Sequence, residues 1–290
     1  MAKRTESARK AILRRVRKQR LKYIAILPSL VTISNGVFGF IAIVMASKGS
    51  KVEGGEVSYY AIAGYMIFFA MIADMLDGRL ARMSKSTSSF GGQLDSLCDV
   101  ISFGVAPAFL MIEILQTKLA STWFGQNVSL HRFLWLAAAV YVSCAAIRLA
   151  RFNVENEEDE SAHMSFIGLP SPAAAGVLAS VVIFHQEIVP SWNFVLYVLP
   201  ALAFGTGILM VSRFRYPHVL NQYFKGRKPF SYLIRALFLL GLVIWRRQIA
   251  LVLIFCGFAG SSLFRWLYYK TIRRSEHLVE TVVDLEPEQQ

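Results

Sequence analysis

The chain has 290 residues, of which 55% are hydrophobic and only 17% are charged. A soluble domain carries about a quarter charged residues, and the deficit here falls in long uncharged runs, which excludes a soluble protein and predicts an all-α, polytopic membrane protein. The net charge is +12. Because the basic residues cluster beside the apolar runs, we read them as topology signals and expect no nucleic-acid partner.

Residues 1–23 form a basic segment ahead of the first apolar run. Within it, Arg9–Lys22 has the pattern of an amphipathic helix, with apolar residues among the charges, which predicts a helix lying on an anionic leaflet. A disordered tail that only sets topology is the alternative. No cleavable signal peptide is expected, because the first apolar run is too long and no small-residue cleavage site follows it.

Eight membrane spans are predicted from the uncharged runs, and several need polar flanks to reach the roughly 20 residues of a perpendicular span. They are Ile24–Ser47, Ser58–Asp77, Leu94–Ile114, Phe133–Arg151, Pro170–Gln186, Trp192–Ser212, Ser231–Trp245 and Gln248–Tyr268. We divide the chain into a six-helix catalytic core at 24–212, two additional helices at 213–270 and a solvated tail at 271–290. An acidic loop is expected at 153–161, between the fourth and fifth spans.

The distribution of basic residues predicts the orientation. Ten Lys and Arg residues lie between Lys3 and Lys22, and further basic groups follow the sixth and eighth spans. By the positive-inside rule both termini are then cytoplasmic, and the loops at 48–57 and 115–132 face outward. Arg246 and Arg247, between the last two spans, are an exception to this rule.

Four aspartates stand at the ends of two apolar runs, in the spacing Asp74-x2-Asp77 and Asp95-x3-Asp99. A carboxylate at bilayer depth costs roughly 2.5–3.5 kcal/mol, so cations must offset four of them. Each pair lies on one face of a helix, and two such faces turned together would form a carboxylate cage. Oxygen ligands of this kind suit two divalent cations, Mg²⁺ or Mn²⁺.

Small and basic residues accompany the aspartates. Gly78, Ala81 and Gly91 would let a ligand approach the helix backbone, and Arg82 can contact phosphate oxygens. Taken singly, small residues in membrane helices usually serve helix packing, and an arginine at a helix end usually extends its charge to the interface.

The eight positions of this pattern match without a gap the signature of the CDP-alcohol phosphotransferase family, which the chain therefore resembles. The matching residues are Asp74, Asp77, Gly78, Ala81, Arg82, Gly91, Asp95 and Asp99. The resemblance implies a six-helix transmembrane core, often dimeric, that transfers a substituted phosphate from a CDP-linked donor to an alcohol and releases CMP. It further implies a polar cavity open to the cytoplasm.

The same resemblance implies the residue roles. Asp74, Asp77 and Asp95 would be metal ligands, and Asp99 would complete the cage and act as general base on the acceptor hydroxyl; a ligand role alone is the alternative for Asp99. Gly78, Ala81 and Arg82 would hold the cytidine diphosphate together with Asp74 and Gly91. In similar enzymes the stretch that ends at Asn35 lies beside the nucleotide.

Four stretches outside the signature, at 101–108, 146–153, 166–175 and 210–217, resemble the membrane-embedded (type II) phosphatidylserine synthases. This resemblance implies CDP-diacylglycerol as donor and L-serine as acceptor, in contact with membrane lipids. Arg148 and Arg151 share a helix face and are candidates for the serine carboxylate or a donor phosphate, with Asn153 beside them; contact with lipid headgroups is their alternative. Glycerol phosphate, inositol phosphate or choline remain possible acceptors, and a divalent-cation channel or transporter is the interpretation from another class.

Overall fold

The computed structural model describes residues 29–49, 58–84, 89–119, 122, 127–158, 166–212, 215–216 and 246–261. The predicted amphipathic helix Arg9–Lys22, the predicted span Ser231–Trp245 and the tail at 271–290 lie outside these residues. Within them the protein is all-α apart from one short strand pairing, as the sequence predicted.

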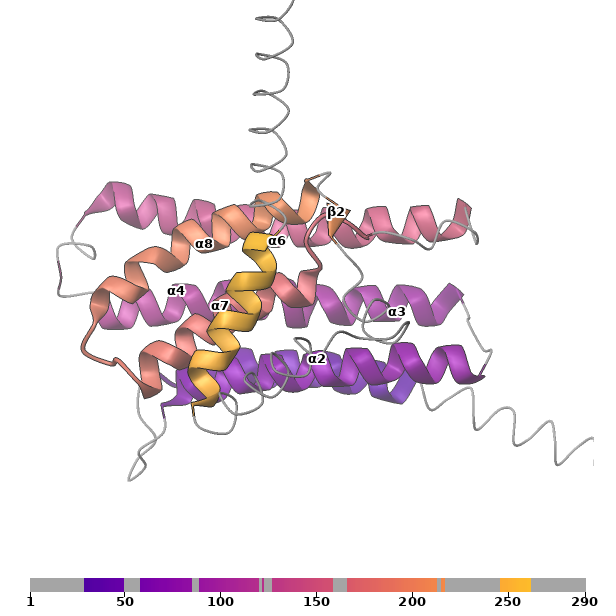
Figure 1. Ribbon diagram of the computed structural model, residues 1–290, viewed down its shortest axis with the longest axis horizontal. Coiled ribbons are helices and arrows are strands. Elements are labelled where there is room, and N and C mark those ends of the chain that lie inside the picture. The colour runs from indigo at the N-terminus through magenta and orange to yellow at the C-terminus, as the bar shows by residue number, and fades with distance from the viewer. Residues whose placement is uncertain are drawn as a thin grey trace, which may run out of the picture.

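The helices follow one another along the chain with short connections. They are the helix Ser29–Ser47, α2 (Tyr59–Ser84), α3 (Ser89–Asp99), η1 (Val100–Val105), α4 (Ala106–Leu119), α6 (Val128–Glu158), α7 (Ser171–Glu187), α8 (Asn193–Val211) and the helix Arg247–Ser261. Figure 1 shows α2, the α3–α4 rod and α6 running alongside one another, with the helix Arg247–Ser261 crossing in front of α7.

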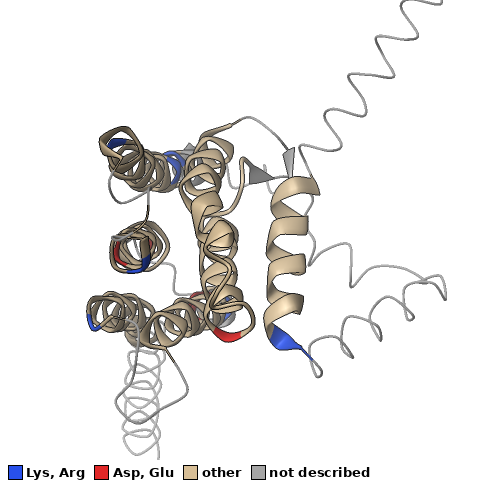
Figure 2. Cartoon of the chain, turned by 90° about the vertical axis from the view of Figure 1, so that its left-hand side faces the viewer, with Lys and Arg blue, Asp and Glu red and all other residues tan. Residues whose placement is uncertain are grey.

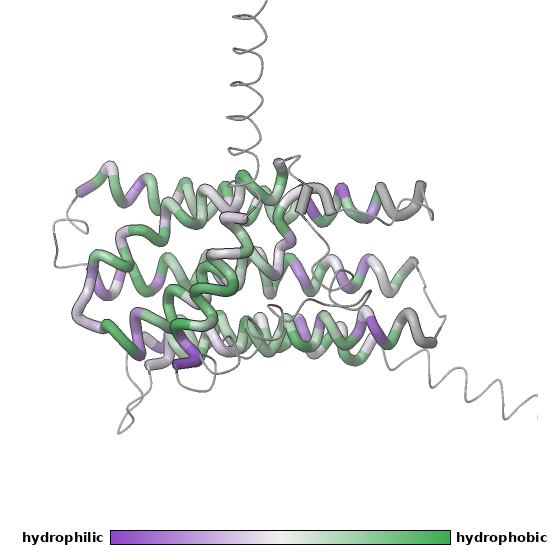
Figure 3. Tube along the Cα trace, viewed as in Figure 1, coloured by the Kyte–Doolittle hydropathy of each residue, from purple (hydrophilic) through white to green (hydrophobic). Residues whose placement is uncertain are grey.

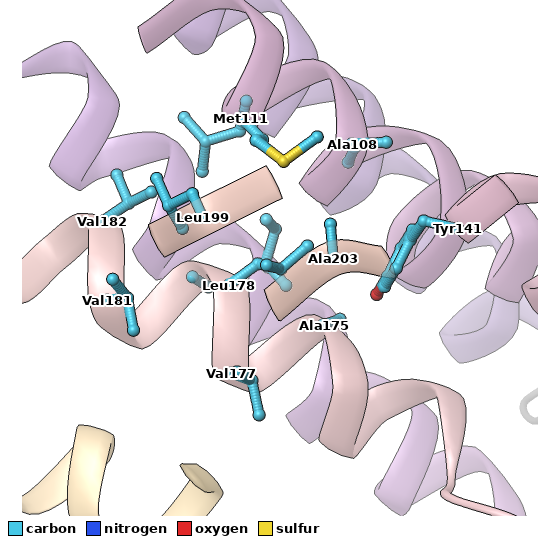
Figure 4. Packing of buried hydrophobic residues seen from close by; sticks show 14 of the residues in the cluster. Ala108, Met111, Tyr141, Ala175, Val177, Leu178, Val181, Val182, Leu199 and Ala203 are labelled. Carbon is cyan, nitrogen blue, oxygen red and sulfur yellow. The ribbon is translucent and has the colours of Figure 1, made fainter. Parts of the chain in front are cut away.

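The apolar core lies where α4, α6, α7 and α8 meet. Met111 of α4, Leu178 of α7 and Leu199 of α8 are almost completely buried and point toward one another (Figure 4). Ala203 fills the space beside them, and Tyr141 of α6 closes the cluster at one side. Small residues among large ones let these helices approach closely, which is the usual packing of membrane helices.

The outer surface of the helices is strongly apolar. Large side chains such as Phe40, Phe69, Trp135 and Phe194 are 48–74% exposed, and charged residues are few along the described helices (Figure 2). Five helices are long and apolar enough to cross a membrane. Water would not tolerate so large an apolar surface, whereas lipid does, so the chain is a multi-pass membrane protein. Hydrophilic residues gather toward the end where α2 ends and α3 begins (Figure 3).

Several helices extend beyond the predicted spans. α2 continues past Asp77 to Ser84, and α6 continues past Arg151 to Glu158, through most of the segment expected to be an acidic loop. The predicted limits were set where charged residues begin. Charged side chains end an apolar run without ending a helix, since Arg and Glu are good helix formers.

A π-helical segment, η1, joins α3 to α4 directly after Asp99. Here the N–H of Ala106 donates to the carbonyl of Ile101, five residues earlier. Tyr141 of α6 donates its hydroxyl to the carbonyl of Phe103 within this segment, at 2.9 Å. Both side chains are fully buried. Turns of this kind occur frequently at functional sites.

The start of α7 is held against the end of α8. Gly168 has φ +84°, and a Cβ at this position would collide with the carbonyl oxygen of Met210, so the turn requires glycine. The preceding strand β1 (Phe166–Ile167) pairs antiparallel with β2 (Arg215–Tyr216). Pro170 and Pro172 flank the first residue of α7, as the sequence suggested.

Candidate active site

Three carboxylates from α2 and α3 converge in the structure. Asp74, Asp95 and Asp99 each offer an oxygen, and these oxygens all lie within 4.8 Å of one another. Asp99 is 7% exposed, and Asp74 and Asp95 are partly buried. The two helix faces predicted from the aspartate spacing are therefore turned toward each other.

Asp77 lies next to this group rather than inside it. Its side chain is 4% exposed and is hydrogen-bonded to Thr32 of the first helix. One of its oxygens, Oδ2, is buried without a partner among the described residues, and so is Oδ1 of Asp95. Asp77 and Asp95 are close enough to interact electrostatically. Buried carboxylate oxygens without donors are what a cation would satisfy.

Asn35 of the first helix reaches the carboxylate group. Its Nδ2 donates to Oδ1 of Asp99 at 2.8 Å, and the residue is fully buried. Its own Oδ1 has no partner among the described residues. The residue expected near a nucleotide thus contacts the residue expected to act as base.

Arg148 of α6 stands beside the carboxylates. It interacts electrostatically with Asp99 and Asp74, and its Nη1 donates to the hydroxyl of Ser171 at 3.0 Å. Ser171 is the first residue of α7 and is 1% exposed. Arg148 therefore connects α6 to the start of α7 while its charge faces the acidic group. Arg151 lies one turn farther along α6.

Asn153 has a partner on α3. Its Nδ2 donates to the hydroxyl of Ser96 at 2.8 Å, and Ser96 also donates to the backbone carbonyl of Gly92, one turn earlier in α3. Since Ser96 follows Asp95, this bond ties α6 to the part of α3 that carries the carboxylates.

The glycine at position 78 borders open space. A Cβ at Gly78 would meet no atom of another element within 4 Å among the described residues. Glycines used for helix packing look different: a Cβ at Gly64 would meet the side chain of Ile183 at 2.7 Å. Gly91 lies near the start of α3. Ala81 and Arg82 fall on the last turns of α2, and the structure describes their backbone only.

The sequence did not single out several residues that hold the site together. Ser96 and Ser102 bind across to other helices, and Tyr141 binds the π-helical segment. Ser96 and Ser102 do carry a sequence signal, because each is a polar residue within one turn of an essential-looking aspartate. Tyr141 carries none, because its partner is a backbone carbonyl of a distant segment.

The site has an excess of negative charge. Three convergent carboxylates and a fourth beside them face one close cation, Arg148, among the residues that the structure describes. A set of hard oxygen donors with unpartnered lone pairs is suited to divalent cations such as Mg²⁺ or Mn²⁺.

Comparison with known proteins agrees with this site. Residues 25–211 match the family model described as CDP-alcohol phosphatidyltransferase. The chain is similar to a CDP-diacylglycerol–serine O-phosphatidyltransferase of Helicobacter pylori strain J99, with 32% identity over 83% of this chain and 91% of the relative. It is also similar to the proteins of that name from Methanocaldococcus jannaschii, 31% identical over 70% of this chain and 80% of the relative, and Bacillus subtilis, 29% identical over 66% and 90%. The chain belongs to the CDP-alcohol phosphatidyltransferase family.

Proposed function

We propose that this protein is a membrane-embedded phosphatidylserine synthase that transfers a phosphatidyl group from CDP-diacylglycerol to L-serine. The observation that carries the proposal is the convergence of Asp74, Asp95 and Asp99 in a chain whose relatives bear the name of this reaction. The serine hydroxyl oxygen forms a bond to the phosphorus that bears diacylglycerol. The bond from that phosphorus to the oxygen of CMP breaks, and CMP leaves.

Asp74, Asp77, Asp95 and Asp99 are the residues that would hold two divalent cations, Mg²⁺ or Mn²⁺. Their unpartnered buried oxygens and the excess of negative charge support this assignment. Bound in this way, the cations would neutralise the diphosphate and polarise the phosphorus that is attacked.

Asp99 would take the proton of the serine hydroxyl, which is a poor nucleophile until a nearby base accepts it. It is one of the two most deeply buried of the four carboxylates, and its position between Asn35 and Arg148 fixes it against two neighbouring helices. A role as ligand alone is the alternative.

The nucleotide would lie along α2, beside the open surface at Gly78. Asp74, Gly78, Ala81, Arg82 and Gly91 form this proposed binding region, with Asn35 at its inner edge. The absence of a side chain at Gly78 supports close approach of a ligand to the helix backbone, since none of the described neighbours uses that space for packing.

Serine brings a carboxylate of its own into an acidic site, so a cation must receive it. Arg148 is that cation in our proposal, because it is largely buried between the aspartates and the start of α7. Arg151 and Asn153 would extend the same surface of α6 toward the acceptor or a phosphate. A planar guanidinium suits either group through paired hydrogen bonds.

We further propose that the site faces the cytoplasm, where the basic segments of the chain are expected. Residues 24–212 would form the catalytic core and residues 213–270 an addition to it, with both termini cytoplasmic. The acyl chains of the donor would leave sideways between helices into lipid, and two copies of the chain would form a homodimer.

The test is the release of CMP by the purified protein in the presence of CDP-diacylglycerol and one alcohol at a time. We expect release with L-serine, dependent on added Mg²⁺ or Mn²⁺. Release with glycerol phosphate, inositol phosphate or choline but not with serine would reject the proposed acceptor. The matched control is Asp99→Asn, which preserves the shape of the side chain and should release no CMP with any alcohol.

A further inference from the structure

We propose that Asn35 is a positioning residue: it holds the carboxylate of Asp99 in one orientation from a neighbouring helix. The inference rests on the proposed function, because it assigns Asn35 a task through Asp99. Its basis is the 2.8 Å hydrogen bond from Nδ2 of Asn35 to Oδ1 of Asp99, between two side chains that are 0% and 7% exposed.

The chemistry of the two groups fixes the direction of this bond. An ionised carboxylate accepts hydrogen bonds and donates none, so the amide nitrogen of Asn35 must face Asp99. A bond to a charged acceptor is also stronger than one between neutral groups. Because it occupies Oδ1, the second oxygen of Asp99 is left for a cation or for the acceptor proton.

The backbone of Asn35 is fixed by the same segment that carries Asp99. Ser102 donates its hydroxyl to the carbonyl of Asn35 at 2.9 Å. A Cβ at Gly36 would lie 3.0 Å from Sγ of Cys98, and a Cβ at Gly39 would lie 2.7 Å from Cα of Ser102. The first helix therefore packs closely on both sides of Asp99, and the amide of Asn35 has little freedom to move away from it.

The local structure at Asp99 gives this contact a purpose. α3 ends at Asp99, and the π-helical segment η1 begins at the next residue. The regular hydrogen-bond pattern changes at this point, so the helix that carries Asp99 holds it less uniformly than a continuous α-helix would. The hydrogen bond from Asn35 supplies a restraint from outside that helix.

Steady-state kinetics separate this role from a nucleotide contact. Asn35→Leu keeps the approximate size of the side chain and removes the donor. Loss of a partner that orients a ligand or base typically costs 10–100-fold in activity, so we expect kcat at saturating donor and acceptor to fall by about that factor. A nucleotide contact alone would raise KM for CDP-diacylglycerol and leave kcat unchanged.

The control for this measurement is Ser34→Ala, one residue away on the same helix. The Ser34 hydroxyl is bonded to the carbonyl of Leu30 within its own helix, and its loss should leave kcat within about twofold of the wild type. Asn35→Ala serves as a second variant if Asn35→Leu does not fold, as judged by gel filtration in detergent.

A second readout does not depend on turnover. Binding of Mn²⁺ is measured by the loss of the free-ion electron paramagnetic resonance signal, in the wild type, Asn35→Leu, Asp99→Asn and the double variant. We expect Asn35→Leu to weaken Mn²⁺ binding about tenfold in the wild-type background and by less than about twofold in the Asp99→Asn background. This non-additivity is the signature of an effect that acts through Asp99.

The outcomes distinguish the two proposals. An unchanged kcat in Asn35→Leu, or an equal loss of Mn²⁺ affinity with and without Asp99, overturns the positioning role. If the wild type releases CMP only with an alcohol other than serine, the proposed acceptor fails, and the same comparison is made with that alcohol. If no alcohol supports turnover, the proposed function fails and the Mn²⁺ cycle alone decides the role of Asn35.

Discussion

At the scale of single residues, the site is a balance between repulsion and function. Carboxylates within 4.8 Å of one another repel, and burial in a poorly polarisable environment increases that cost. Arg148 offsets only part of it. A group of residues that opposes folding when empty and binds cations when filled is expected of a metal site, because the ligands are arranged for the ion rather than for the protein alone.

Asp95→Asn tests this balance directly. The amide keeps the shape of the side chain and removes one negative charge, so in the presence of a chelator the variant should be more stable than the wild type by about 1 kcal/mol, or roughly 2–4 °C. Turnover should fall at least about 100-fold, since outer partners of a metal site alone cost up to that much. Thermal unfolding with EDTA and CMP release measure the two effects.

Added Mg²⁺ provides the control for this variant. A cation that binds only the folded protein raises its unfolding temperature, and the rise should be smaller in Asp95→Asn than in the wild type. Near-wild-type turnover in the variant would contradict the assigned ligand role of Asp95.

At the scale of elements, the sequence predicted where apolar helices lie but not how they end or deform. The aspartate spacing placed Asp95 and Asp99 on one helical face because that rule depends only on local periodicity. The π-helical segment after Asp99 could not be predicted, since it is matched to a hydroxyl from Tyr141, about forty residues later in the chain. The bond from Asn35 to Asp99 is likewise a product of helix packing and leaves no local pattern.

Tyr141→Phe removes the bond that α6 makes to this π-helical segment. The hydroxyl is lost and the carbonyl of Phe103 stays buried in η1, so the cost should be about 1–3 kcal/mol. Turnover should also fall, because η1 begins directly after Asp99. Chemical or thermal unfolding in detergent checks the first effect, and a variant as stable as the wild type would show that the bond contributes little.

Glu187 at the end of α7 joins the helix Arg247–Ser261 to the bundle. It accepts hydrogen bonds from Tyr65 at 3.1 Å and from Gln248, and it lies 3.7 Å from Arg247. The Phe255 ring of the same helix lies against Gly176 of α7. One of the two arginines that break the positive-inside rule is therefore paired with an acidic residue.

Glu187→Ala should loosen this helix more than Arg247→Gln does. The Glu187 side chain is 15% exposed and leaves buried partners behind, whereas that of Arg247 is 64% exposed. We expect a loss of about 1–3 kcal/mol for the first variant and less than about 1 kcal/mol for the second, as for surface ion pairs generally. Thermal unfolding of both variants makes the comparison, and equal losses would contradict it.

At the scale of the whole molecule, the two ends of the bundle differ in chemistry. The carboxylates of α2 and α3 lie toward one end, and the Glu187 group lies toward the other, where α7 ends and α8 begins. A channel would need polar groups across the full depth of the membrane. Here the core between the two ends is apolar (Figure 4), which agrees with an enzyme that takes its polar substrates from one side.

The proposed orientation predicts which loops an impermeant reagent can reach. With the native cysteines Cys98, Cys144 and Cys256 replaced by alanine, Asn127→Cys lies in the connection before α6 that we place outside, and Ser161→Cys lies in the segment after α6 that we place in the cytoplasm. In intact bacterial cells a charged maleimide should label the first variant and not the second, and permeabilised cells should show both. The reverse pattern would place the carboxylates on the outer side, away from cytoplasmic CDP-linked donors, because α6 would then run in the opposite direction through the membrane.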